Sequence, residues 1–216
     1  MLGIPGDLEP GHYEVVLVDD REEPVLTREL EVTQKAFRAE TIELSSPMSE
    51  LRQTDDPRRL SESRALWQLL NQRNPTRLYH LEPFCVPLHE SVRSSHFGDR
   101  RLFVYTDGGT EGSMHSGIDL VASSGTPVLS SGNGLVVFAG ERLITGNTVV
   151  IEHLPGLYSL YYHLEELFTS EGDTVVVGQE IGLIGATGLV TGVHLHWEFR
   201  IGGVPVDPDS MTTLEL

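Results

Sequence analysis

The sequence predicts a mostly β protein, and three observations lead to this prediction. Glycine occurs 22 times and proline 12 times in 216 residues, as expected where tight turns separate short strands. Several stretches alternate apolar and polar residues, which is the period of a half-buried strand. A single segment near the middle has a helical period instead. We therefore expect a small β-sandwich-like N-terminal unit, a short helical segment and an antiparallel two-sheet C-terminal domain.

The N-terminal unit is predicted over residues 1–46. Residues 11–18, 25–32 and 36–44 each alternate between apolar and polar side chains, and the Asp-Asp pair after the first of them favours a turn. Three such strands fit a small β-sandwich-like unit.

A helical connecting segment is predicted over residues 47–90. Within it, residues 57–73 place an apolar set roughly on one face of a helix: Leu60, Ala65, Leu66, Leu69 and Leu70. An Asn-Pro pair then ends the helical pattern.

The third predicted domain spans residues 91–216. Its short strands are separated by glycine-containing turns, which indicates antiparallel sheets that fold over one another. The predicted strands are residues 102–105, 117–122, 126–130, 134–139, 148–153, 158–163, 174–177, 181–187 and 192–201.

Charge and cysteine content exclude several classes of function. Acidic residues outnumber basic ones by 32 to 15, so the net charge of −17 provides no attraction to nucleic acid or to an anionic membrane. No apolar run approaches the length of about 20 residues that crosses a bilayer. Cys85 is the single cysteine, which excludes an intramolecular disulfide and a cysteine-based zinc site.

Two histidines share one face of the last predicted strand. Side chains alternate along residues 192–201, so His194, His196, Glu198 and Arg200 face one way and an apolar set faces the other. The two imidazoles stand about 6.6 Å apart along a strand. They can therefore reach one small site, although a pair of surface histidines is the alternative.

A second pair, His115 and Asp119, has a glycine between its members. In a straight strand these residues would stand about 13 Å apart, too far to share one metal ion. A bend is easiest at Gly117, so this glycine makes sense if both side chains converge on a metal. A glycine-containing turn with a capping aspartate is the alternative.

His163 lies on the polar face of an otherwise apolar predicted strand, opposite Leu160, Tyr162 and Leu164. Such a histidine is either part of a site or a structural residue bonded to the backbone. The sequence pattern leaves both interpretations open.

One aspartate and two histidines would offer an anionic oxygen and two neutral nitrogens. Three protein ligands leave the fourth tetrahedral position open, which is the arrangement of a catalytic zinc. Imidazole ligands and the absence of further cysteines favour zinc over calcium or magnesium. Additional histidines beside the metal can exchange protons near neutral pH.

These three segments, in this order, resemble the signatures of the lysostaphin-type (LytM-like) zinc metallopeptidases, a family of peptidoglycan endopeptidases. The chain matches His-x-Gly-x-Asp at residues 115–119, Tyr-x-His-Leu at residues 161–164 and the glycine-rich stretch ending in His-x-His at residues 185–196. The resemblance extends from about residue 93 to residue 208. Val193 departs from the proline that many relatives have there.

The resemblance implies a two-sheet fold of the duplicated hybrid motif type and one Zn²⁺ ion. It implies that His115, Asp119 and His196 are the zinc ligands and that His163 and His194 are the catalytic histidines. The expected reaction is hydrolysis of peptide crosslinks or stem peptides of bacterial peptidoglycan, through zinc-activated water and histidine general acid–base catalysis.

Supporting roles are predicted for four further residues. Some relatives place a tyrosine near the site to stabilise the oxyanion, and Tyr105 and Tyr161 are the candidates here. Glu198 and Arg200, on the strand face of His196, are candidates for orienting a histidine.

The resemblance also implies an exported protein, periplasmic or extracellular. No signal peptide is visible at Met1, so we expect any such signal to have been removed. The N-terminal unit could place the enzyme, bind an envelope protein partner or inhibit the site. A non-catalytic scaffold or activator of a cell-wall hydrolase is the alternative function, and the five filled positions argue against it. The bond that is cut is left open.

Overall fold

The structure, a computed structural model, describes residues 1–213. It is mostly β and largely antiparallel, which confirms the predicted fold class. None of its helices is long and apolar enough to cross a membrane. The helices are α1 (Ser46–Gln53), α2 (Pro57–Leu70) and α3 (Pro208–Thr212). The strands are β1 (Gly11–Val18), β2 (Pro24–Val32), β3 (Ala39–Glu43), β4 (Val92–Ser95), β5 (Arg100–Val104), β6 (Thr110–Met114), β7 (Ile118–Val121), β8 (Pro127–Leu129), β9 (Gly134–Arg142), β10 (Gly146–Leu154), β11 (Leu157–Leu167), β12 (Thr174–Val175), β13 (Glu180–Ile184), β14 (Leu195–Ile201) and β15 (Val204–Val206).

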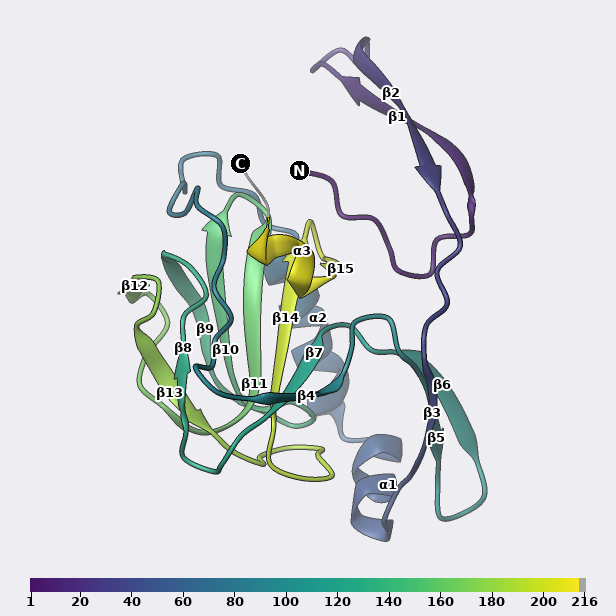
Figure 1. Cartoon of the computed structure of the whole chain (residues 1–216), viewed down its shortest axis with the longest axis vertical. Coiled ribbons are helices and arrows are strands. Elements are labelled where there is room, and N and C mark those ends of the chain that lie inside the picture. Colours follow the sequence, from purple (N-terminus) through teal and green to yellow (C-terminus); the bar gives the residue numbers. More distant parts are fainter. Residues whose placement is uncertain (214–216) are drawn as a thin grey trace.

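Ten antiparallel strands form the main sheet. Its central order is β12-β9-β10-β11-β14-β7-β4, and β8, β13 and β15 pair off this path. Strand β11 pairs with β14 through its first half and with β13 through its second half. The sheet therefore folds over, so that β8 and β13 lie in front of β9 and β10 (Figure 1).

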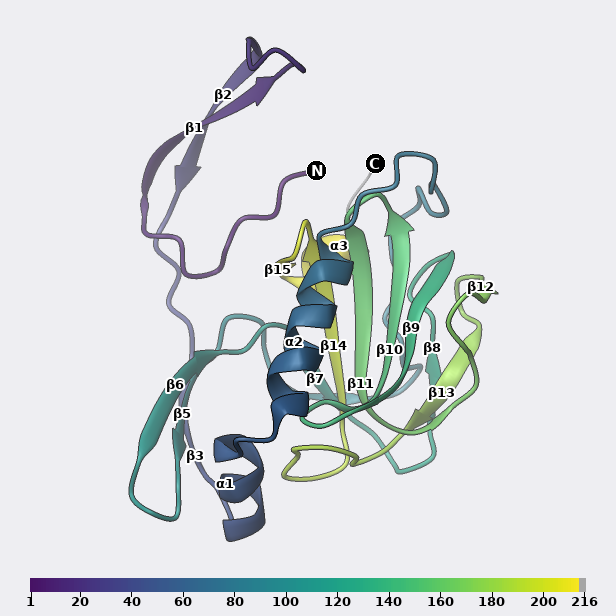
Figure 2. The ribbon, with the colours of Figure 1, turned by 180° about the vertical axis from the view of Figure 1, so that it is seen from behind.

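The largest hydrophobic core lies inside this fold. Trp197 and Phe199 of β14, Tyr161 of β11 and Ile151 of β10 are fully buried there. Burial of each such side chain stabilises the fold by about 1.5–3 kcal/mol. The outer face of β10 and β11 is covered by α2, which contributes Leu70 to a second core (Figure 2). Strand β14, which carries His196, lies between β11 and β7 in the main sheet.

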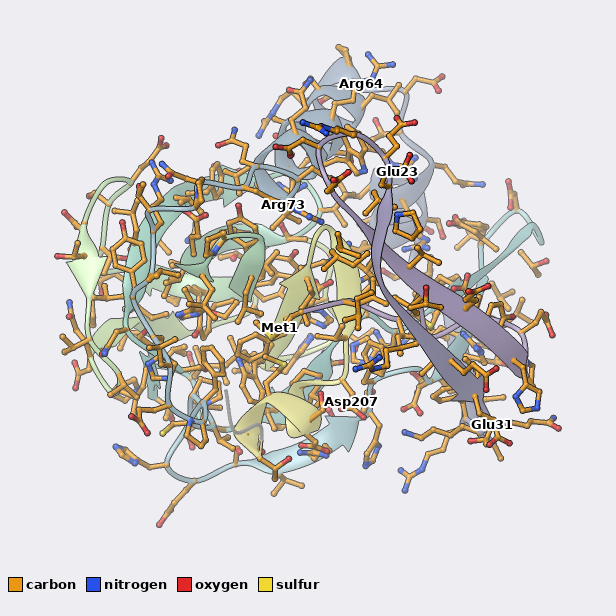
Figure 3. All side chains as sticks on the ribbon, turned by 90° about the horizontal axis from the view of Figure 1, so that it is seen from above. Met1, Glu23, Glu31, Arg64, Arg73 and Asp207 are labelled. Atoms are coloured by element: carbon orange, nitrogen blue, oxygen red, sulfur yellow. The ribbon has the colours of Figure 1, made fainter. Side chains whose placement is uncertain are left out.

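The prediction of a small β-sandwich-like N-terminal unit is wrong. Strands β1 and β2 form a separate two-stranded sheet, and β3 instead pairs in parallel with β5. The hairpin projects from the body, with Glu23 near its turn and Glu31 toward its base (Figures 1 and 3). Although apolar and polar residues alternate along both strands, a two-stranded sheet is too narrow to enclose a core. Val16 and Leu26 therefore stay exposed.

A three-stranded sheet, β3-β5-β6, connects the N-terminal region to the rest of the chain. Strand β3 lies before the predicted boundary at residue 46, whereas β5 and β6 lie after the one at residue 90. The division at these two positions stays a prediction. This small sheet matters for the site because β6 ends at Met114, directly before His115.

Candidate metal centre

The chain turns sharply between β6 and β7, and this turn brings two candidate ligands together. His115 directly follows β6 of the three-stranded sheet, whereas Asp119 lies in β7 of the main sheet. Gly117 packs against β14: a β-carbon there would stand 2.4 Å from the carbonyl oxygen of Trp197. Pairing of β7 with β14 sets His196 directly opposite Asp119.

Three buried side chains converge at this point. His115 Nε2 lies 3.0 Å from Asp119 Oδ1 and 3.0 Å from His196 Nδ1. His196 Nδ1 lies 2.9 Å from the same Asp119 oxygen. The convergence that the glycine spacing predicted is therefore present. The alternative of a pair of surface histidines does not hold for His196, which is buried, while His194 is partly buried.

The contacts of the far nitrogens of His115 and His196 are compatible with a cation bound between the two rings. His115 Nδ1 donates to the carbonyl oxygen of His96 at 2.9 Å, which leaves the lone pair of the neutral ring on Nε2. His196 Nε2 lies 3.5 Å from Glu198 Oε2, which favours the lone pair on Nδ1. With a cation in place of the ring protons, two lone pairs and the carboxylate oxygen of Asp119 would face the same point. Ligand atoms of a tetrahedral zinc site stand about 3.3 Å apart, close to this spacing.

The carboxylate of Asp119 is the negative charge where these three side chains meet. Burial alone would raise the pKa of its carboxyl, but the hydrogen bonds of His115 and His196 hold that pKa well below its usual range. Burial would lower the pKa of His196, yet Asp119 raises it to about 9. Asp119 is therefore an anion at any physiological pH, as a metal ligand must be.

His163 and His194 lie beside the three ligand candidates, with their ring centroids 5.0 Å apart. His163 Nδ1 donates to the carbonyl oxygen of Thr187 and His194 Nδ1 to that of Gly192, each at 2.9 Å. Nε2 of each neutral ring is therefore available to accept a proton. Burial lowers the pKa of His163 to about 3.

The backbone at His163 is strained, because its φ of 65° is in the left-handed region. Strand β11 shifts its register against β10 between Tyr161 and Leu164, the stretch that contains this residue. Strain of about 1–3 kcal/mol at such a position persists only where the surroundings impose it, and it gathers at functional sites. The structure therefore favours the site interpretation of His163 over the purely structural one.

All five residues line one cavity of about 550 Å³. One wall comes from the loop before β14, including Leu189 and Val190. The opposite wall comes from β3 and α1, which lie outside the candidate ligand segments. Its residues are Glu40, Ile42, Leu44, Met48 and Arg52. A cavity of this size can hold a short peptide.

The two tyrosine candidates lie elsewhere, so the prediction that they face the site is wrong. Tyr105 hydrogen-bonds with Glu111 and Arg52. The Tyr161 hydroxyl accepts from the backbone of Ser131 inside the main core. Side chains alternate along β11, so the burial of Tyr161 in the main core places the next residue, Tyr162, on the opposite face of the strand.

Tyr162 is the tyrosine that does line the cavity, and the sequence pattern had assigned it to the apolar face. Its ring stacks on His196 with centroids 5.1 Å apart and planes within 5°. The irregular pairing of β11 with β10 at this point leaves the successive residues Tyr162 and His163 lining the same cavity. Strict alternation could not have shown this.

Glu198 lies next to His196, with Oε2 3.5 Å from His196 Nε2. Its side chain is fully buried and pairs with Arg200. Burial alone would raise the pKa of Glu198, but the charge of Arg200 and the adjacent His196 ring lower it to about 2. An ionised Glu198 can orient the His196 ring.

Arg101 is a site residue that the sequence pattern missed. Its Nη2 lies 2.6 Å from Asp119 Oδ2, the oxygen that does not face the two histidines. No motif or alternation marks this arginine in the sequence, because it stands in a polar stretch next to a second arginine.

Comparison with known proteins places these features in a family. Residues 113–208 match the profile of Peptidase family M23. DD-carboxypeptidase/endopeptidase Mpg of Neisseria meningitidis is 46% identical over 98 residues, 45% of this chain and 23% of Mpg. Peptidoglycan DD-endopeptidase ShyA of Vibrio cholerae is 42% identical over 114 residues, 53% of this chain and 26% of ShyA. The chain thus spans about a quarter of the length of these relatives.

Two solved structures are similar. A putative peptidase M23 from Pseudomonas aeruginosa aligns with 98% of this chain and 77% of its own, with a TM-score of 0.66 and 24% identity, which shows a shared fold. A zinc containing peptidase from Vibrio cholerae aligns with 61% of this chain and 39% of its own, with a TM-score of 0.51 and 33% identity.

Proposed function

Residues 113–208 form a Peptidase family M23 domain, and on this premise we propose that the chain is a zinc-dependent endopeptidase acting on the peptide part of bacterial peptidoglycan. One observation carries the proposal. His115, Asp119 and His196 direct three donor atoms, all within 4.8 Å of one another, to one point. That point borders the cavity that His163 and His194 line.

The proposed ligands of one zinc ion are His115, Asp119 and His196. Two neutral nitrogens and one carboxylate oxygen are a usual donor set of catalytic zinc. When bound, zinc polarises the scissile carbonyl and lowers the pKa of water. The carbonyl oxygen of His96 fixes the His115 ring by accepting from its Nδ1, and Glu198 Oε2 lies 3.5 Å from Nε2 of the His196 ring.

The proposed proton carriers are His194 and His163. His194 is the nearer to the ligands, with Nε2 3.8 Å from Asp119 Oδ1. In the proposal His194 accepts a proton from the attacking water and returns it to the leaving amine. His163 assists this transfer, and a protonated histidine donates to the developing oxyanion.

The proposed substrates are peptide crosslinks or stem peptides. The names of Mpg and ShyA support this class, and the cavity wall formed by Ile42, Leu44 and Met48 offers apolar contacts to an extended peptide. Since this substrate lies outside the cytoplasmic membrane, we propose a periplasmic or extracellular location. The projecting β1–β2 hairpin is the part that we propose to meet an envelope protein partner.

A digestion of purified peptidoglycan sacculi tests the function. The zinc-loaded wild-type protein should release muropeptides whose masses, by mass spectrometry, identify the bond cut. A chelator should stop release, and added zinc should restore it. Zinc bound at one equivalent without any released product would instead support the non-catalytic scaffold.

A further inference from the structure

We propose that Arg101, itself held by Glu40, is a positioning residue that fixes the Asp119 carboxylate for metal binding. Strand β3 would then be part of the metal centre, although it lies outside the residues that match the family. The inference rests on the proposed function, since it assigns a role toward the same zinc ligands.

The guanidinium of Arg101 bridges two carboxylates. Its Nη2 donates to Asp119 Oδ2 at 2.6 Å, and its Nε donates to Glu40 Oε1 at 2.6 Å. Asp119 Oδ1 faces His115 and His196, so the two oxygens of this aspartate have separate partners. The chain of contacts runs from Glu40 through Arg101 to the ligand candidate.

Strand register explains why these side chains meet. In the parallel pair of β3 and β5, Glu40 stands directly opposite Arg101. In the antiparallel pair of β5 and β6, Arg101 stands opposite Ser113, two residues before His115. Figure 1 shows β3, β5 and β6 side by side on the flank of the main sheet. The small sheet thus positions a ligand candidate and its arginine together.

Burial makes the contact consequential. The Asp119 side chain is 7% exposed and that of Arg101 is 16% exposed, whereas Glu40 is 38% exposed. A buried carboxylate oxygen without a partner is costly, and the two imidazoles face only Oδ1. Arg101 therefore satisfies Oδ2 and favours coordination through Oδ1 alone.

A lysine cannot replace this arginine fully. The planar fork of arginine directs two separate N–H groups at two carboxylates, while lysine presents one ammonium nitrogen. Residues that hold a metal ligand from behind typically change metal affinity by about 10–100-fold when replaced. We expect a loss in this range for Arg101→Met and a smaller loss for Arg101→Lys.

Zinc affinity, measured by competition with a chromophoric chelator, tests the inference in the full chain. Arg101→Met should weaken zinc binding by about 10-fold or more. Glu40→Ala should weaken it less, and should add no loss in the Arg101→Met background because the two act as one unit. Arg52→Met is the matched control: Arg52 lines the same cavity but pairs with Glu111, so zinc affinity should stay unchanged.

The cobalt(II) absorption spectrum gives a second reading that a general loss of stability would not produce. If Arg101→Met frees Oδ2 to coordinate, the visible bands should weaken as the coordination number rises, and Arg101→Lys should restore part of their intensity. Glu40→Ala keeps the test open if Arg101→Met does not fold, because Glu40 is partly exposed.

Unchanged or tighter zinc binding in Arg101→Met or Glu40→Ala would overturn the inference, since Arg101 would then only neutralise a metal-free aspartate. Failure of the proposed function is distinct: there the wild-type protein itself would bind no zinc or release no product.

Discussion

Gly117 lies against Trp197 so closely that a β-carbon at residue 117 would also stand 2.9 Å from His196 Nε2. Gly117→Ala should therefore push β7 away from β14 and separate Asp119 from His196. We expect a stability loss of about 1–3 kcal/mol together with loss of stoichiometric zinc. Urea unfolding and metal analysis measure the two effects.

Gly112→Ala is the matched control, since nothing lies within 4 Å of a β-carbon there. It should bind zinc as the wild type does. If Gly117→Ala also retained full zinc binding, the close approach of β7 and β14 would have no part in forming the site.

Replacing a proposed zinc ligand and replacing a proposed proton carrier should have different effects on zinc content and activity. His115→Ala removes a proposed ligand, so zinc and hydrolysis should be lost together. His194→Ala should keep the metal, since three ligands remain, and should slow muropeptide release by about 10²–10⁴-fold. The exposed His89 gives the control, and His89→Ala should change neither quantity.

A metal-loaded His194→Ala protein that digests sacculi at the wild-type rate would remove His194 from the proposed mechanism. Loss of zinc from this variant would place His194 among the ligands instead.

Sequence patterns predicted most of the peptidase half because its signals are local. Alternating segments became β9, β10, β11 and β14, and the spacing around Gly117 indicated a bend. The order of the histidine motifs along the chain indicated one site, and strand pairing does bring them together. The alternation and the bend are local signals, and only the order of the motifs extends along the chain.

The remainder depends on contacts between distant segments. Whether β3 joins β2 or β5 is decided by pairing across about sixty residues, and the alternation is the same in both cases. For the same reason the sequence could not connect Glu40 with Arg101. The misplaced tyrosines have a different cause, since the choice between Tyr161 and Tyr162 depends on an irregularity in the pairing of β10 with β11 that no periodicity shows.

His153 should make the fold sensitive to acid. It is fully buried, with Nδ1 donating to the carbonyl oxygen of Asn133 and Nε2 bonded with Ser159 Oγ, both at 2.7 Å. Burial lowers its pKa to about 3. The unfolded chain, with a histidine pKa of about 6.5, therefore binds a proton first as the pH falls. Stability contributed by neutral His153 is present above pH about 6.5 and is lost toward pH about 3.

Urea unfolding at pH 7.5 and pH 5.0 measures this effect. Between these values His153 should account for about 2 kcal/mol of the loss in wild-type stability. His153→Phe should be less stable at both pH values, yet lose about 2 kcal/mol less on acidification. An equal loss in both proteins would show that His153 is protonated at little cost inside the fold.

Tyr162 should support the metal centre through its ring. It lies parallel to the His196 imidazole within 5°, and an aromatic pair of this kind contributes about 0.5–1.5 kcal/mol. Tyr162→Leu should therefore weaken zinc binding by about 2–10-fold in chelator competition, while Tyr162→Phe keeps the stacked ring and should remain within about twofold of wild type. Tyr13→Leu, on the projecting hairpin, controls for loss of a tyrosine elsewhere. If the Phe variant lost as much affinity as the Leu variant, the hydroxyl of Tyr162, and not its stacked ring, would hold His196 in place.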